Sequence, residues 1–146
     1  MFILLINGFM INCFAEGVSY SSDYFERGAG ITNDGHLIFV EYFFSIECFF
    51  ESSNMSISMQ RNYTYMIEAY INYFIRQYIV IYISQFSVLD INFCQNEFYN
   101  EFMEYVSDKL NEIILDIVGL NYVQITKLEI LENPETMANR LRQIEQ

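Results

Sequence analysis

The single histidine of the chain, His36, is the first place where acid–base chemistry could occur. Asp34 precedes it by two residues, so a carboxylate is at hand to orient the imidazole ring. A general base also needs a nucleophile or a substrate pocket beside it, and neither a triad nor a metal-binding set can be assembled around His36. We therefore expect a solvated histidine where a strand begins.

The cysteines suggest redox chemistry only if the protein is exported. Cys48 falls on an apolar strand face, and Cys94 falls in the connection before a predicted helix. These two thiols could form a disulfide bond in an oxidising compartment, or they could be two small buried hydrophobic residues. The second interpretation is favoured, and the pairing stays open.

Carboxylates are numerous, but they follow the outer side of a predicted helix. The residues concerned are Glu97, Glu101, Glu104, Asp108 and Glu112. Calcium binding would instead require ligands crowded into a loop with glycine at the turn. The sequence has no phosphate-binding glycine loop, CxxC motif or HExxH motif. It thus predicts no enzyme, no catalytic residue, no metal site and no cofactor.

Composition limits the classes of partner. The 146 residues are 53% hydrophobic and 18% aromatic, which is typical of a packed globular domain. The formal net charge of -12 would repel a phosphate backbone and an anionic membrane surface, because both bind through cationic groups. Nucleic acid is therefore excluded as a partner, and a basic protein partner is permitted.

The first 35 residues divide into a leader and a tether. Residues 1–15 form an apolar stretch with the length of a signal-peptide core, and Ala15 is a plausible residue before a cleavage site. The stretch is shorter than the roughly 20 apolar residues of a membrane span. We expect a signal peptide or a membrane anchor there, with a buried first strand or helix as the other possibility. Residues 16–35 are rich in Gly, Ser and Asp and predict a tether.

Residues 36–146 predict one α+β domain. Apolar residues alternate from Ile38 to Phe50, which predicts a long strand with one buried side. A helical period follows from about Gln60, and we expect this helix to continue through residues 78–83, although the run YIVIYI is also compatible with a strand. Glu68, Asn72 and Arg76 fall on the side opposite to its apolar stripe, which predicts a solvated face.

The second half of the domain shows a clearer pattern. An apolar stripe from Phe98 to Ile117 predicts a second helix, and Gly119 is expected to end it in a left-handed conformation. Residues 122–131 predict a strand, and Asn133 followed by Pro134 predicts the start of a short final helix. The expected order is β-α-α-β-α, with a small sheet covered by two main helices.

Residues 36–132 resemble the C-terminal periplasmic domain of the flagellar basal-body-associated FliL family. Leu89 and Asp90 match a Leu-Asp pair between the two helices, and Leu110 and Asn111 match a Leu-Asn pair near the end of the second helix. The final strand of the family is approximated by Ile125, Lys127, Glu129 and Ile130. The resemblance implies a stomatin-like (SPFH-like) fold and a single-pass inner-membrane protein. It further implies that the periplasmic part self-associates and supports the torque-generating stator units of the motor.

Two functions from different classes therefore follow from the sequence. The first is a non-enzymatic scaffold in bacterial motility, held at the periplasmic side of the inner membrane and in contact with copies of itself and with a membrane complex. The alternative is a secreted or effector-type binding protein with an aromatic-lined apolar pocket, released after cleavage near Ala15. Cleavage of the leader, the identity of the partner and the oligomeric state stay open.

Overall fold

A computed structural model describes residues 4–5, 10–11, 17–51, 55–93 and 95–145 of the chain. Its elements in chain order are β1 (Leu4–Leu5), β2 (Met10–Ile11), β3 (Gly17–Ile31), β4 (Leu37–Glu51), α1 (Ile57–Ile83), α2 (Gln95–Asp116), β5 (Leu120–Glu132) and α3 (Pro134–Glu145). Strands β1 and β2 pair with each other, and the rest of the predicted leader lies outside the described residues.

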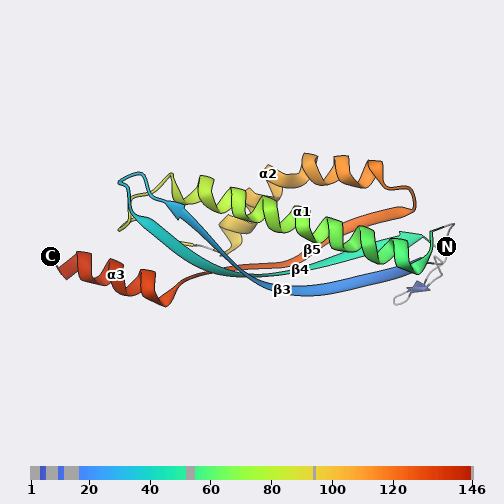
Figure 1. Cartoon of the computed structure of the whole chain (residues 1–146), viewed down its shortest axis with the longest axis horizontal. Helices are drawn as coiled ribbons and strands as arrows, with labels where there is room; N and C mark the ends of the chain where they lie inside the picture. Colours follow the sequence, from blue (N-terminus) through green and yellow to red (C-terminus); the bar gives the residue numbers. More distant parts are fainter. Residues whose placement is uncertain (1–3, 6–9, 12–16, 52–54, 94, 146) are drawn as a thin grey trace.

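The domain is a mixed α+β structure with one three-stranded antiparallel sheet in the order β3-β4-β5. Helices α1 and α2 lie on the same face of this sheet, whereas α3 leads away from the end of β5 (Figure 1). A sheet covered on one face must bury alternate residues of its central strand. Strand β4 does so, because seven alternate residues from Ile38 to Phe50 are at most 1% exposed. The predicted long strand is confirmed.

Helix α1 begins at a serine cap and continues to Ile83. The Ser56 hydroxyl accepts a hydrogen bond from the backbone N–H of Met59 at 3.2 Å, which satisfies one of the free donors of the first turn. Isoleucines at positions 67, 71, 75, 79 and 83 are completely buried against the sheet. The prediction that residues 78–83 continue the helix is confirmed.

Helix α2 and the elements after it also follow the predicted pattern. Phe98, Phe102, Val106 and Leu110 are buried, and Gly119 ends the segment with φ 92°, which favours glycine. Strand β5 then pairs with β4 in antiparallel register. At the start of α3, the side-chain oxygen of Asn133 accepts a hydrogen bond from the Glu135 N–H at 2.9 Å, as expected for a helix cap.

The predicted tether is wrong for residues 17–31, which form the edge strand β3 and pair with β4 along its whole length. The sequence did not predict this strand, because its positions that face the helices are not consistently apolar. They include Ser22, Glu26, Gly28 and Gly30. The glycines have a packing role. A Cβ atom on Gly30 would lie 2.9 Å from the Ile83 side chain, so only glycine lets α1 approach the strand this closely.

A polar stripe on α1 holds β3 in place. Its residues recur every four positions and are Gln60, Thr64, Glu68, Asn72 and Arg76. The Tyr20 hydroxyl donates a hydrogen bond to Gln60 at 2.8 Å, and the Tyr24 hydroxyl bonds the Glu68 side chain. The predicted solvated face is therefore wrong for Glu68, which is 8% exposed. These hydroxyl groups belong to the sheet, so the sequence pattern of the helix alone does not reveal them. They supply the hydrogen-bond partners that let these polar residues face inward.

Candidate interaction surface

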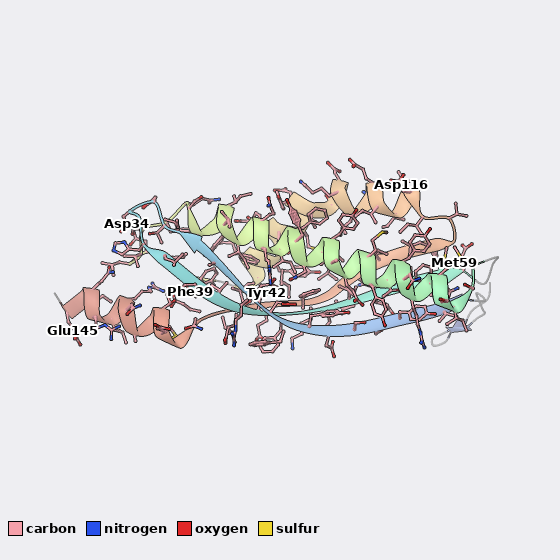
Figure 2. All side chains as sticks on the ribbon, viewed as in Figure 1. Asp34, Phe39, Tyr42, Met59, Asp116 and Glu145 are labelled. Carbon is pink, nitrogen blue, oxygen red and sulfur yellow. The ribbon has the colours of Figure 1, made fainter. Side chains whose placement is uncertain are left out.

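The side of the sheet that faces away from α1 and α2 has no covering element among the described residues (Figures 1 and 2). We call this side the open face. It consists of five cross-strand rows, formed by Ser19, Ser21, Asp23, Phe25 and Arg27 on β3, Phe49, Glu47, Ser45, Phe43 and Glu41 on β4, and Tyr122, Gln124, Lys127, Glu129 and Leu131 on β5. The strict alternation of strands places these residues on one side.

Aromatic side chains form two pairs on the open face. Phe25 and Phe43 lie opposite each other with ring centroids 4.7 Å apart, and Phe49 stacks on Tyr122 at 5.4 Å. Phe25 is 46% exposed and Leu131 is also 46% exposed. Large apolar side chains that are this exposed on a regular sheet indicate a contact surface rather than part of a core.

The central row of the open face carries both signs of charge. The Ser45 hydroxyl donates a hydrogen bond to the Asp23 carboxylate at 2.5 Å. Lys127 occupies the same row on β5, is exposed, and forms no ion pair within the described part of the chain. Two rows further along, the Arg27 guanidinium lies 3.7 Å from the Glu41 carboxylate. The two edges of the central row thus carry opposite charges.

On the other side of the central row, the Glu47 carboxylate accepts hydrogen bonds from two hydroxyl groups. Ser19 donates to it at 2.7 Å and Tyr122 donates at 3.3 Å. Partial burial, followed by the neighbouring charge of Glu47 and the hydrogen bond to it, raises the pKa of Tyr122 above its ordinary value. The phenol therefore stays neutral and remains a donor at physiological pH.

Two hollows border strand β3. A shallow one of about 460 Å³ lies on the open face and is lined by Asp23, Phe25, Phe43 and Lys127, among others. A larger one of about 690 Å³ lies near the β3 edge and is lined by residues that include Arg27, Arg76, Glu135 and a single aromatic residue, Phe39. Charged groups border both hollows.

His36 and Asp34 lie at the turn between β3 and β4, 3.4 Å apart. The Asp34 carboxylate accepts hydrogen bonds from the Thr32 hydroxyl at 2.6 Å and from the backbone N–H of Val88 at 3.1 Å. The bond from Thr32 is the largest cause that lowers the pKa of Asp34. These contacts connect the hairpin turn to the segment that follows α1. Asp34 therefore has a structural role.

Cys48 is a free, completely buried cysteine on the covered face of β4. Burial raises the pKa of its thiol to about 12, and a thiol that is neutral and buried is a poor nucleophile. Cys94 lies outside the described residues. The preferred interpretation, a small buried hydrophobic residue, is confirmed for Cys48.

The acidic residues of α2 lie on its exposed side, as predicted for Glu97, Glu101, Glu104, Asp108 and Glu112. Glu101 accepts a hydrogen bond from the Tyr78 hydroxyl at 2.9 Å, so part of this row also connects α2 to α1. Within the described residues, no group of three or more His, Cys, Asp or Glu side chains is placed to hold a metal ion.

Sequence reasoning did not identify the open face. A signal for it was present, because Phe43 and Phe49 occupy positions of β4 that alternate with the buried ones. The acidic and serine residues at the same alternating positions, Glu41, Ser45 and Glu47, made these positions look uniformly polar. The opposing residues on β3 were also assigned to a tether, so no cross-strand partner was available for comparison.

In the part of the chain that the structure describes, no helix combines the length and the apolar character needed to cross a membrane. Even α1, with 27 residues, carries a polar stripe along its length.

No protein-family model matches the chain, and neither a curated protein nor a solved structure was found to match it.

Proposed function

We propose that this chain is a non-enzymatic scaffold whose α+β domain acts by protein–protein contact through the open face. The observation that supports this function is the exposure of aromatic and aliphatic side chains on a sheet whose other face is already packed. Contiguous apolar patches of several hundred Å² on soluble domains are typical of sites that contact proteins or membranes. The net charge of -12 disfavours an anionic membrane and favours a protein as the partner.

The resemblance of residues 36–132 to the FliL family supports a more specific version of this proposal. In this version the domain is stomatin-like (SPFH-like), stands in the periplasm, and supports the stator units of the flagellar motor. The order of two helices between the central strand β4 and the last strand β5 agrees with the part of the family pattern that the matched residues cover. Leu89 and Asp90 lie between these helices, and Leu110 is buried in the second.

Complementation of motility tests the proposal. Deleting the gene should reduce swimming in soft agar, and the intact chain should restore it. The Phe43→Asp variant should accumulate normally but fail to restore swimming, because it places a charge in the centre of the contact surface. Cross-linking in living cells should link the intact chain, but not this variant, to a membrane protein of the motor.

Tyr65→Asp serves as the matched control, because Tyr65 is a 63% exposed aromatic residue on α1, away from the open face. This variant should restore swimming fully. Normal swimming after gene deletion would contradict the flagellar role. Full complementation by Phe43→Asp would contradict the use of the open face, and release of the chain into the medium after cleavage near Ala15 would favour the secreted binding protein.

A further inference from the structure

We propose that the first partner of the open face is the open face of a second copy of this chain, in a two-fold dimer whose axis runs parallel to β4 between the two sheets. This inference deepens the scaffold function proposed above and rests on it. It states which surface carries the self-association and in which orientation. Four properties of the described residues support it, namely area, charge, symmetry and the position of the central row.

The area of the open face is sufficient for a small, weak dimer. Its five rows span nine residues of β4, so three strands at about 4.8 Å spacing and roughly 3.3 Å per residue give roughly 430 Å² per copy. Two copies would then bury roughly 860 Å², which is in the range of weak, transient protein–protein contacts. Two sheets that pack face to face at about 10 Å also form the ordinary two-layer sandwich, with sheets rotated by roughly 30°.

The open face carries both signs of charge. Its five rows contain four carboxylates and two basic groups. The acidic groups are Asp23, Glu41, Glu47 and Glu129, and the basic groups are Arg27 and Lys127. Each copy therefore presents both signs of charge to the other, and opposite charges can pair across the contact.

Symmetry selects one orientation of the two sheets. With the axis parallel to β4, β3 of one copy lies over β5 of the other, so Asp23 faces the second copy's Lys127, and the same pair forms twice. With the axis across the strands, Asp23 would face Asp23 and Lys127 would face Lys127. Like charges that face each other cost binding energy, whereas opposite charges favour the correct register.

The central row is also the place where two twisted sheets stay closest together. Sheets packed at an angle diverge toward their corners, so contacts concentrate near the crossing point. Ser45 lies near the middle of β4, in the same row as Asp23 and Lys127, and the Phe25–Phe43 pair occupies the adjacent row. The complementary charges and an aromatic pair therefore coincide with the region of closest approach.

Residues on the axis would face their own copies. Glu41 meets Glu41 there, but each of these carboxylates has the Arg27 guanidinium beside it at 3.7 Å. Glu47 meets Glu47, and each accepts hydrogen bonds from the Ser19 and Tyr122 hydroxyls. These contacts within one copy reduce the repulsion between the two carboxylates of each pair.

A charge-exchange experiment tests the dimer and its orientation. The full chain, purified in a mild non-ionic detergent, is followed by analytical ultracentrifugation over a range of concentrations, and circular dichroism checks the fold of each variant. The intact chain should dimerise. Asp23→Lys and Lys127→Asp should each raise the dissociation constant by about tenfold or more, because each replaces two attractive pairs by two repulsive ones.

Mixing the two weakened variants should restore a dimer. The introduced lysine of one copy then faces the introduced aspartate of the other, and the unchanged Lys127 of the first faces the unchanged Asp23 of the second. The double variant should dimerise like the intact chain. Glu112→Lys on α2 and Arg61→Asp on α1 change the net charge by the same amounts at exposed positions and should leave the dissociation constant unchanged.

Each contrary result overturns the inference. A chain that stays monomeric at every concentration excludes the dimer. A dimer that Asp23→Lys does not weaken uses another surface or the other axis, and a mixture that stays dissociated shows that these two residues do not face each other. Failure of the dimer can be distinguished from failure of the scaffold function. A monomeric chain that still restores swimming and still cross-links to the motor retains the scaffold function.

Discussion

Tyrosine hydroxyl groups connect the edge strand β3 and the central strand β4 to helix α1. Tyr20 bonds Gln60, Tyr24 bonds Glu68, and Tyr42 bonds Asn72. Each bond pairs a polar group that would otherwise be buried without a partner, and such unpaired groups are costly. At the residue scale, the position of β3 therefore depends on phenol groups as much as on apolar contact.

Tyr24→Phe should lower the free energy of unfolding by about 1–3 kcal/mol, because it leaves the Glu68 carboxylate without its hydroxyl donor. Among the described residues, Oε1 of Glu68 has no hydrogen-bond partner. Urea denaturation measures the change. Tyr70→Phe, at a position that is 45% exposed, should change the free energy by less than about 0.5 kcal/mol. Equal effects of the two substitutions would contradict the role of the Tyr24 hydroxyl.

Stability should fall in alkaline solution between about pH 10 and about pH 12. Burial and the hydrogen bond to Glu68 raise the pKa of Tyr24 from 10.0 to about 12, and burial also raises the pKa of Tyr42 and Tyr78. The unfolded chain releases these protons first, so their contribution is complete below pH 10 and is lost as the pH rises through the folded-state value.

Unfolding free energies, together with tyrosinate absorbance, test this pH dependence. The Tyr24→Phe variant should lose less stability over the same interval, because one of the shifted groups is missing. A stability that stays constant to pH 12 would show that the tyrosines ionise equally in both states.

Helix α2 packs against the covered face of the sheet through one apolar stripe. Phe102 is completely buried, and its ring centroid lies 5.9 Å from that of Tyr78 on α1. The outer side of the same helix is acidic, and like charges four residues apart destabilise an isolated helix slightly. At the element scale, burial of the stripe must therefore outweigh the repulsion along the exposed side.

Phe102→Ala should cost about 3–5 kcal/mol of unfolding free energy, because it opens a cavity between α1, α2 and the sheet. Leu115→Ala is the matched control on the same helix, where the side chain is 83% exposed, and it should cost less than about 0.5 kcal/mol. Chemical denaturation of both variants gives the comparison. A small loss for Phe102→Ala would mean that α2 does not pack as described.

The whole molecule carries a large excess of negative charge, with 19 acidic residues against 7 Lys and Arg residues. Self-repulsion of this size destabilises the compact state and makes stability depend on ionic strength. The open face carries both signs of charge, so opposite charges can pair there when another acidic copy approaches. Charge therefore links the stability of the domain to its proposed assembly.

Raising sodium chloride from about 0.01 M to about 0.15 M should increase the melting temperature, because the Debye length falls from about 30 Å to about 8 Å. A gain of about 1 kcal/mol corresponds to roughly 2–4 °C for a domain of this size. Calorimetry or circular dichroism at low protein concentration measures the shift. Glu112→Lys should reduce it, and a melting temperature that falls with salt would contradict dominant self-repulsion.

By itself, the sequence determined the elements whose apolar pattern is visible within their own residues. The alternation from Ile38 to Phe50 and the stripe from Phe98 to Ile117 are complete in the local sequence. Gly119 marks the end of a segment through its backbone preference, and Asn133 marks the start of α3 through its side-chain cap. These features depend on which side of an element is apolar, and that information is local.

Only the tertiary structure decided the rest. Strand β3 carries glycine and polar residues on its covered side, and it forms a strand because α1 approaches the glycines and offers polar partners from another part of the chain. Glu68 is buried for the same reason. The open face likewise exists only when Phe25 lies beside Phe43 and Asp23 lies in one row with Lys127, a register that cross-strand pairing sets and that no single segment contains.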